Sequence, residues 1–170
     1  MKNTILFFVL FLFVFFPGCK KSSTTPEAEY LMTFKVNGIA DTLINYYGAV
    51  QPTPSSTKTD FFVNARSKDN KNHFLLSIQQ AEKITSGTYE TGNNDYFIIA
   101  DYFKNQAAPD ERDFTIDNAD GKPNGYFKIV ITSISNTLIT GTFSSNYLYD
   151  RTYNESLVIT DGSFAVKRNK

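Results

Sequence analysis

The sequence predicts an all-β protein, with an antiparallel β-sandwich of about eight to ten strands as the main expectation and a closed or partly closed, lipocalin-like β-barrel as the alternative. Clusters of Gly, Pro, Asn and Asp recur about every 8 to 12 residues, and no apolar pattern of helical period is sustained. The segment Gly125–Ile134 also alternates, with Phe127, Ile129 and Ile131 on one face, as in a half-buried strand.

The first strands flank a strong turn signal. Tyr30–Val36 and Ile39–Ile44 lie on either side of Asn37-Gly38, the dipeptide that most readily supplies the two positive φ angles of a tight hairpin turn. Tyr46–Val50 is expected to continue this strand or begin another. The later expected strands are Phe61–Arg66, His73–Ile78, Thr88–Thr91, Asp95–Lys104, Asp113–Asp117, Gly125–Ile134, Thr137–Tyr149, Glu155–Thr160 and Ser163–Lys167.

Two short segments are expected to interrupt the strands. Gln79–Ser86 suits one helical turn around Ala81, Glu82 and Lys83. Asp161-Gly162 has the composition of a turn between the last two strands.

The segment before the domain has the organisation of a secretory signal peptide. Lys2 lies in a short polar start, and an unbroken apolar run follows from Ile5 to Phe16. That run is shorter than the roughly 20 residues of a spanning helix. The Gly18-Cys19 pair that follows resembles the lipobox of bacterial lipoproteins, which implies a signal peptide over residues 1–18 and lipidation of Cys19. The alternatives are a soluble secreted protein and a signal anchor.

The residues after Cys19 are predicted to form a flexible tether over residues 19–29, because Lys20–Glu29 is polar and has no apolar periodicity. In the Bacteroidota lipoproteins that the leader resembles, an acidic run after the cysteine marks export to the cell surface. The first acid here is Glu27. We therefore expect a lipid anchor in the outer membrane, with the periplasmic face favoured over the cell surface, and a single β-rich domain over residues 30–170.

The charge balance bears on the partners. The chain has 17 basic and 17 acidic residues. This neutrality argues against nucleic acid as a partner, since such binding depends on a basic footprint. Cys19 is the only cysteine, so no disulfide is expected to stabilise the domain.

Several strand and turn motifs together resemble a group of small Bacteroidota lipoproteins with a β-rich domain of unknown function. These motifs are Phe34-Lys35-Val36-Asn37-Gly38, Ser86-Gly87-Thr88-Tyr89, Ile139-Thr140-Gly141-Thr142-Phe143 and Ile159-Thr160-Asp161-Gly162-Ser163-Phe164. The resemblance covers most of the mature chain. It implies a fold and a compartment, and it brings no catalytic residue or cofactor with it.

Residues that could carry chemistry are few. His73 is the only histidine and is expected at the surface. No metal site and no cofactor are predicted, because one histidine without a free cysteine does not make the usual ligand set for zinc or copper. An acid-rich stretch could hold calcium in an irregular loop or supply a hydrolytic carboxylate pair, although turn formation explains it better. Its members are Asp110, Glu111, Asp113, Asp117 and Asp120.

Tyrosines near strand ends form the candidate binding site. Tyr147, Tyr149 and Tyr153 are placed where aromatic rings could stack on a sugar or a peptide, with core packing as the alternative. Asp41-Thr42-Leu43 resembles a short O-glycosylation pattern of exported Bacteroidota proteins.

The sequence therefore favours a non-catalytic binding or interaction module, attached to a membrane by lipid, with a glycan or an envelope protein as partner. The alternatives are a structural or assembly subunit of an envelope complex and a hydrolase that uses loop carboxylates.

Overall fold

The computed structural model describes residues 30–52, 59–117 and 125–169, and these residues form ten β-strands and no helix. The strands are β1 (Leu31–Val36), β2 (Ile39–Pro52), β3 (Thr59–Arg66), β4 (His73–Gln80), β5 (Gly87–Glu90), β6 (Tyr96–Lys104), β7 (Arg112–Asp117), β8 (Phe127–Ile134), β9 (Leu138–Asp150) and β10 (Glu155–Asn169). Within the described ranges, no helix is long and apolar enough to cross a membrane.

Eight of the strands close into a barrel. Hydrogen bonds join β1, β2, β3, β4, β6, β7, β9 and β10 in that order, and β10 pairs with β1 to complete the ring. β8 and β5 extend the sheet from β9. The pairs are antiparallel except for a short parallel contact between β10 and β2. The predicted all-β class is confirmed, and the closed ring corresponds to the barrel alternative.

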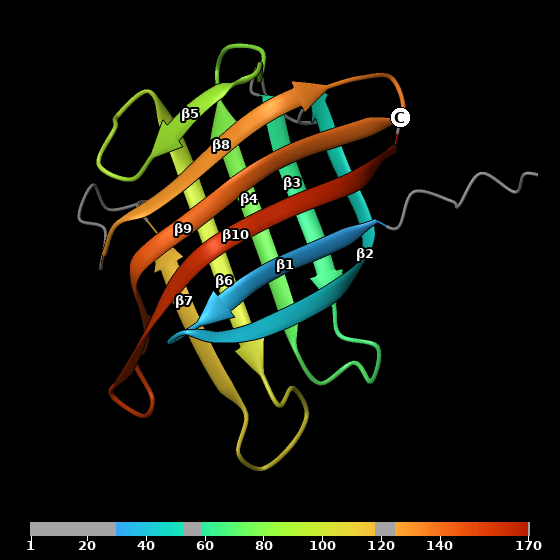
Figure 1. Cartoon of the computed structure of the whole chain (residues 1–170). Helices are drawn as coiled ribbons and strands as arrows, with labels where there is room; N and C mark the ends of the chain where they lie inside the picture. Colours follow the sequence, from blue (N-terminus) through green and yellow to red (C-terminus); the bar gives the residue numbers. More distant parts are fainter. Residues whose placement is uncertain (1–29, 53–58, 118–124, 170) are drawn as a thin grey trace, which may run out of the picture.

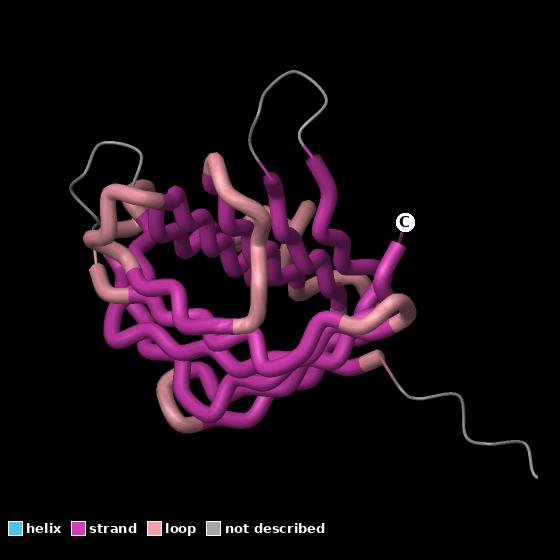
Figure 2. Tube along the Cα trace, turned by 90° about the horizontal axis from the view of Figure 1, so that it is seen from above, coloured by secondary structure: helices cyan, strands magenta, loops and turns pink. Residues whose placement is uncertain are grey.

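The barrel is flattened into two layers, so its architecture is close to the sandwich that was the main expectation. Figure 1 shows β1, β10, β9, β8 and β5 in front of β3, β4, β6 and β7, while β2 bends from one layer into the other. Seen from above, the two layers face each other across the interior (Figure 2). The bend in β2 coincides with a register shift between Asn45 and Tyr47.

Two local predictions were wrong, because pairing on both sides of a strand outweighs a weak local signal. The expected turn at Asp161-Gly162 is a bulge inside β10, with Asp161 at a φ of 53° and Gly162 still paired with Phe143. The expected helical turn is absent: β4 continues to Gln80, which pairs with β3 and β6, and an irregular connection follows it.

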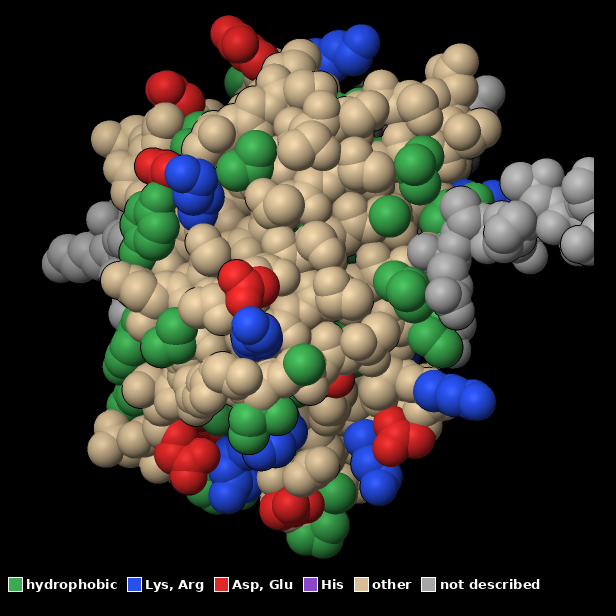
Figure 3. Space-filling model, viewed as in Figure 1, with side chains coloured by type: hydrophobic (Ala, Val, Ile, Leu, Met, Phe, Trp, Pro, Cys, Tyr) green, Lys and Arg blue, Asp and Glu red, His purple; other side chains and the backbone are tan. Residues whose placement is uncertain are grey.

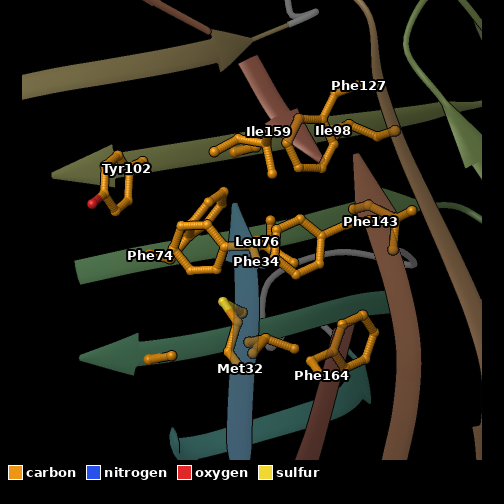
Figure 4. Packing of buried hydrophobic residues seen from close by; sticks show 14 of the residues in the cluster. Met32, Phe34, Phe74, Leu76, Ile98, Tyr102, Phe127, Phe143, Ile159 and Phe164 are labelled. Atoms are coloured by element: carbon orange, nitrogen blue, oxygen red, sulfur yellow. The ribbon is translucent and has the colours of Figure 1, made fainter. Parts of the chain in front are cut away.

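Aromatic rings from both layers meet at the centre of the barrel. The ring of Phe74 lies 5.2 Å from that of Phe34 and 5.2 Å from that of Phe143, both edge to face. Phe34 and Phe143 are 5.8 Å apart, so the three rings form a closed triangle, the aromatic triangle (Figure 4). Edge-to-face pairs add about 0.5–1.5 kcal/mol each to the gain from burial. The triangle therefore joins β1 and β9 of the front layer to β4 of the back layer.

Two glycines leave space for core phenylalanines, Phe143 of the triangle and the neighbouring Phe164. A Cβ at Gly141 would overlap the ring of Phe164 and the Val130 carbonyl, and a Cβ at Gly162 would overlap the ring and carbonyl of Phe143. The backbone must approach closely at both positions, which only glycine permits.

We predict that Gly162→Ala destabilises the domain by about 1–3 kcal/mol, since the added methyl group would overpack the region around Phe143. Gly87→Ala is the matched control, because a Cβ there meets nothing within 4 Å. That variant should be neutral or slightly stabilising. Urea unfolding of the two variants measures the difference, and equal stability of Gly162→Ala and the wild type would contradict the packing argument.

Candidate functional site

A pocket of about 330 Å³ opens at one end of the barrel. The β1–β2 turn and the β3–β4 and β6–β7 loops lie at this end, at the bottom of Figure 1, because the strands alternate in direction. The pocket is lined by Val36, Asn37, Ile39, Ala40, Asp41, Asn72, Tyr102 and Lys104. We call it the barrel-end pocket.

The β1–β2 turn forms one wall of this pocket. Asn37 and Gly38 have φ angles of 49° and 84°, which confirms the predicted hairpin turn. The turn is also tied to β10: the backbone N–H of Asn37 donates to the Val158 carbonyl at 2.9 Å, and the Asn37 Oδ1 accepts the Val158 N–H at 2.8 Å. These two bonds hold the wall in place.

Asp41 is the centre of the polar side of the pocket. One carboxylate oxygen accepts hydrogen bonds from the Tyr102 hydroxyl at 2.9 Å and the Asn72 amide at 3.1 Å. The other accepts the backbone N–H of Thr42 at 2.8 Å. Burial raises the pKa of Tyr102 well above its ordinary value, and the Asp41 charge raises it further. Tyr102 therefore stays neutral and keeps donating its proton to Asp41.

The β3–β4 and β6–β7 loops lie on the other side of the pocket from the β1–β2 turn, and hydrogen bonds join them to each other. The Asn72 Oδ1 accepts the Asn105 backbone N–H at 3.4 Å, and the Gln106 N–H donates to the Lys71 carbonyl at 2.7 Å. The Arg66 guanidinium reaches the Gln106 side chain at 3.2 Å. The Asn72 side chain thus connects the β6–β7 loop to Asp41 on β2. Hydrogen bonds therefore link the β3–β4 loop, the β6–β7 loop and Asp41 to one another.

The pocket combines an apolar surface with unpaired charges. Val36, Ile39 and Ala40 supply the apolar part, and the Ile39 side chain is 76 % exposed. Neither Asp41 nor Lys104 has an ion-pair partner among the described residues. A concave apolar surface with a few fixed polar groups is typical of a small-molecule site, and this volume is at the lower end of the usual range of about 300–1,000 Å³.

The structure brings two of the three predicted tyrosines together. Tyr147 and Tyr149 project outward from β9, and their nearly parallel rings are 5.7 Å apart. The Tyr149 hydroxyl donates to Asn154. Tyr153 lies in the β9–β10 turn, where the Arg112 guanidinium carbon is 3.4 Å from the centre of its ring. Intramolecular contacts already use part of each ring, so the role of these tyrosines in binding stays a prediction.

The expectation for His73 was wrong: its side chain is buried, with 8 % exposure. Although it starts β4 next to a polar loop, its ring stacks on Phe103 at 5.4 Å and its Nε2 lies 2.8 Å from the Asn64 Oδ1. Burial lowers the pKa of His73 below its ordinary value, and the charge of Arg66 lowers it further.

We predict that His73 makes the domain less stable as the pH falls. The folded state keeps His73 neutral, whereas the unfolded chain takes up a proton near its ordinary pKa of about 6.5. The free energy of unfolding should therefore drop from about pH 7.5 to about pH 5.5. Urea unfolding of the wild type and His73→Gln at both pH values tests this, and the same pH dependence in the two proteins would contradict the assignment to His73.

The acidic stretch does not gather into one site in the described residues. Asp110 accepts the Asn105 side-chain amide at 2.8 Å, and Glu111 accepts the Ala107 backbone N–H at 2.8 Å, so both shape their own loop. Asp120 and the side chain of Asp117 lie outside the described part. Among the described residues, no three His, Cys, Asp or Glu side chains are placed to hold a metal ion.

Asp113 and Asp150 are close to each other, which bears on the hydrolase alternative. The carboxylate of Asp150 is 2 % exposed and accepts the backbone N–H groups of Asp113, Thr152 and Tyr153. Burial raises the pKa of Asp113, and the charges of Asp150 and Glu111 raise it further. The bonding of Asp150 is that of a turn cap.

The two modification candidates, Cys19 and Thr42, both stay predictions. Cys19 lies outside the described residues, so its lipidation stays a prediction. Thr42 is exposed on β2 between half-buried Asp41 and fully buried Leu43. Its hydroxyl faces outward opposite Thr33, and its glycosylation also stays a prediction.

The sequence alone did not reveal the barrel-end pocket. Asp41 stands out in it only as part of a possible modification pattern, and Tyr102 and Lys104 only as the end of a strand. In a ring of alternating strands, every second connection lies at the same end, and this rule would have grouped the first turn with Asn72 and the end of β6.

No protein-family model, no curated protein and no solved structure matches this chain. The proposals below therefore depend on the chain itself, its fold and the geometry of the barrel-end pocket.

Proposed function

We propose that the protein is a lipid-anchored binding module of the bacterial cell envelope, attached to the outer membrane through Cys19, and that it binds a small ligand in the barrel-end pocket. The observation that supports this most directly is the convergence of Asp41, Asn72 and Lys104 beside an apolar wall. Three connections that are far apart in sequence surround the pocket, and hydrogen bonds tie them to one another and to the neighbouring strands.

The position of the pocket suits a tethered receptor. The barrel begins at the start of β1, directly after the proposed tether, and β1 ends at Val36 in the pocket wall. Its six residues span about 20 Å at about 3.3 Å each. The pocket thus lies one strand length from the point where the proposed tether begins, and a multiply acylated Cys19 would hold the protein firmly at the bilayer.

Binding is a better proposal than catalysis for this pocket. A general acid or base works best with a pKa near the operating pH. The pKa of Tyr102 is raised far from neutrality, and three neutral donors surround the Asp41 carboxylate. This arrangement orients a fixed negative charge and supports recognition.

A second candidate function, an assembly subunit of an envelope complex, is favoured by the outer face of the back layer. Half-buried apolar side chains alternate there with the buried core positions, and they are Leu75, Phe97, Ile99 and Phe103. The opposite face, which Figure 3 displays, consists mostly of uncharged polar side chains and backbone with scattered charges. The two faces therefore differ in the kind of contact that they offer.

The membrane anchor is tested by Cys19→Ala. The wild-type protein should incorporate labelled palmitate and sediment with membranes, whereas the variant should lose the label, because no other cysteine is present. Lys20→Ala keeps the cysteine and serves as the control. Palmitate labelling that persists in Cys19→Ala would contradict the proposed anchor.

The ligand site is tested by NMR titration of residues 20–170 with a small library of amino acids, sugars and short fatty acids. Ile39→Trp should fill the pocket and abolish binding while removing no side-chain hydrogen bond, because Ile39 lies opposite Val36 on the face of β2 that lines the pocket. Ile44→Trp, the same change at an exposed position on the other face of β2, should bind normally. Shifts confined to Tyr147 and Tyr149 would move the site to the tyrosine pair. An envelope protein that co-purifies, with a silent pocket, would favour the assembly subunit.

A further inference from the structure

We propose that the barrel-end pocket recognises a zwitterion, an α-amino acid with an aliphatic side chain, whose ammonium group binds Asp41 and whose carboxylate binds Lys104. This inference rests on the proposed function of the pocket and adds the chemical class of its ligand.

The carboxylate of Asp41 supplies a negative charge on one side of the pocket. Asp41 receives three hydrogen bonds, and all of them come from neutral donors on Thr42, Asn72 and Tyr102. These donors fix the carboxylate in position and leave its negative charge uncompensated. A cationic group that enters the pocket would therefore meet an oriented carboxylate, the condition for a strong charge-assisted hydrogen bond.

The two charges of the pocket are separate from each other. Lys104 lines the same pocket at the end of β6, and it pairs neither with Asp41 nor with another described carboxylate. In contrast, Lys35, Lys71 and Lys128 each form an ion pair with a carboxylate outside the pocket lining. A ligand with an ammonium group and a carboxylate on the same carbon can bridge the gap between Asp41 and Lys104 and satisfy both.

The pocket also has an apolar wall. Ile39 is 76 % exposed beside Val36 and Ala40, so water covers apolar surface at the mouth of the pocket. An aliphatic side chain that covers Ile39 would remove that surface from water, which is favourable in proportion to the area buried. The pocket volume of about 330 Å³ suits a molecule of this size.

Other ligand classes fit less well. A fatty acid would meet the Asp41 charge, a phosphate would find a single lysine, and a metal ion would find a single carboxylate. A sugar would lack a stacking surface, because the Tyr102 ring is 2 % exposed and is packed against Phe34 and Phe74. The zwitterion uses both charges of the pocket and its apolar wall.

Three probes of the same carbon skeleton test the assignment: L-leucine, L-leucinamide, which lacks the carboxylate, and 4-methylpentanoate, which lacks the ammonium group. Each is titrated into residues 20–170, which contain the whole described barrel, and binding is followed through the backbone amide signals of the pocket. Leucine should bind at least tenfold more tightly than either analogue.

Two variants assign the charges to their partners. In Lys104→Met, leucine and leucinamide should bind equally, because the partner of the carboxylate is gone. In Asp41→Asn, leucine and 4-methylpentanoate should bind equally. Lys83→Met, at an exposed position beyond the other end of the barrel, should keep the wild-type preference. The comparison of probes in the wild type stays decisive if Asp41→Asn does not fold.

The outcomes separate this inference from the proposed function. Equal binding of the three probes at the pocket would overturn the zwitterion and keep the pocket as a ligand site. A sugar or a fatty acid that shifts the pocket signals while leucine does not would have the same meaning. A pocket that stays silent with the entire library would overturn both proposals.

Discussion

The aromatic triangle of Phe34, Phe74 and Phe143 is the contact on which the other features of the barrel depend. Its members come from β1, β4 and β9, so it joins the two layers at the point where they face each other. The triangle needs close backbone approach beside Phe143, which explains the glycine at 162. With aromatic rings at its centre, the barrel leaves its ends and its outer surface for the proposed binding.

Tyr102 connects this core to the barrel-end pocket. Its ring lies 5.6 Å from both Phe34 and Phe74, and its hydroxyl reaches the carboxylate of Asp41. The packing of the Tyr102 ring in the core therefore also fixes the position of its hydroxyl group beside Asp41. The Tyr102 ring cannot move without disturbing the aromatic triangle, so it holds the carboxylate of Asp41 in place. The proposed binding would therefore cost little ordering entropy.

The sequence was sufficient for the features that local patterns determine. Most strands and the Asn37-Gly38 turn follow from alternation and turn chemistry. Ring closure was not predictable in the same way, because it joins β7 to β9 through a short contact, for which Thr115 with Tyr149 is the one pair in the described residues. The pocket was hidden for a similar reason: the hydrogen bonds of Asp41 connect it to residues 31 and 61 positions away. The bulge at Asp161-Gly162 was mistaken for a turn because both structures favour Asp and Gly, and only the pairing of Gly162 with Phe143 distinguishes them.

The balance of charge on the chain is consistent with recognition at short range. The formal net charge is zero, so the protein has little long-range field with which to attract an ion. At physiological ionic strength, exposed charges act over about 8 Å. Asp41 and Lys104 therefore influence mainly what has already entered the pocket. The proposed zwitterion, which is neutral overall and strongly dipolar, would lose nothing from the absence of long-range attraction and would gain from two opposite charges, of which Asp41 is held in position by hydrogen bonds.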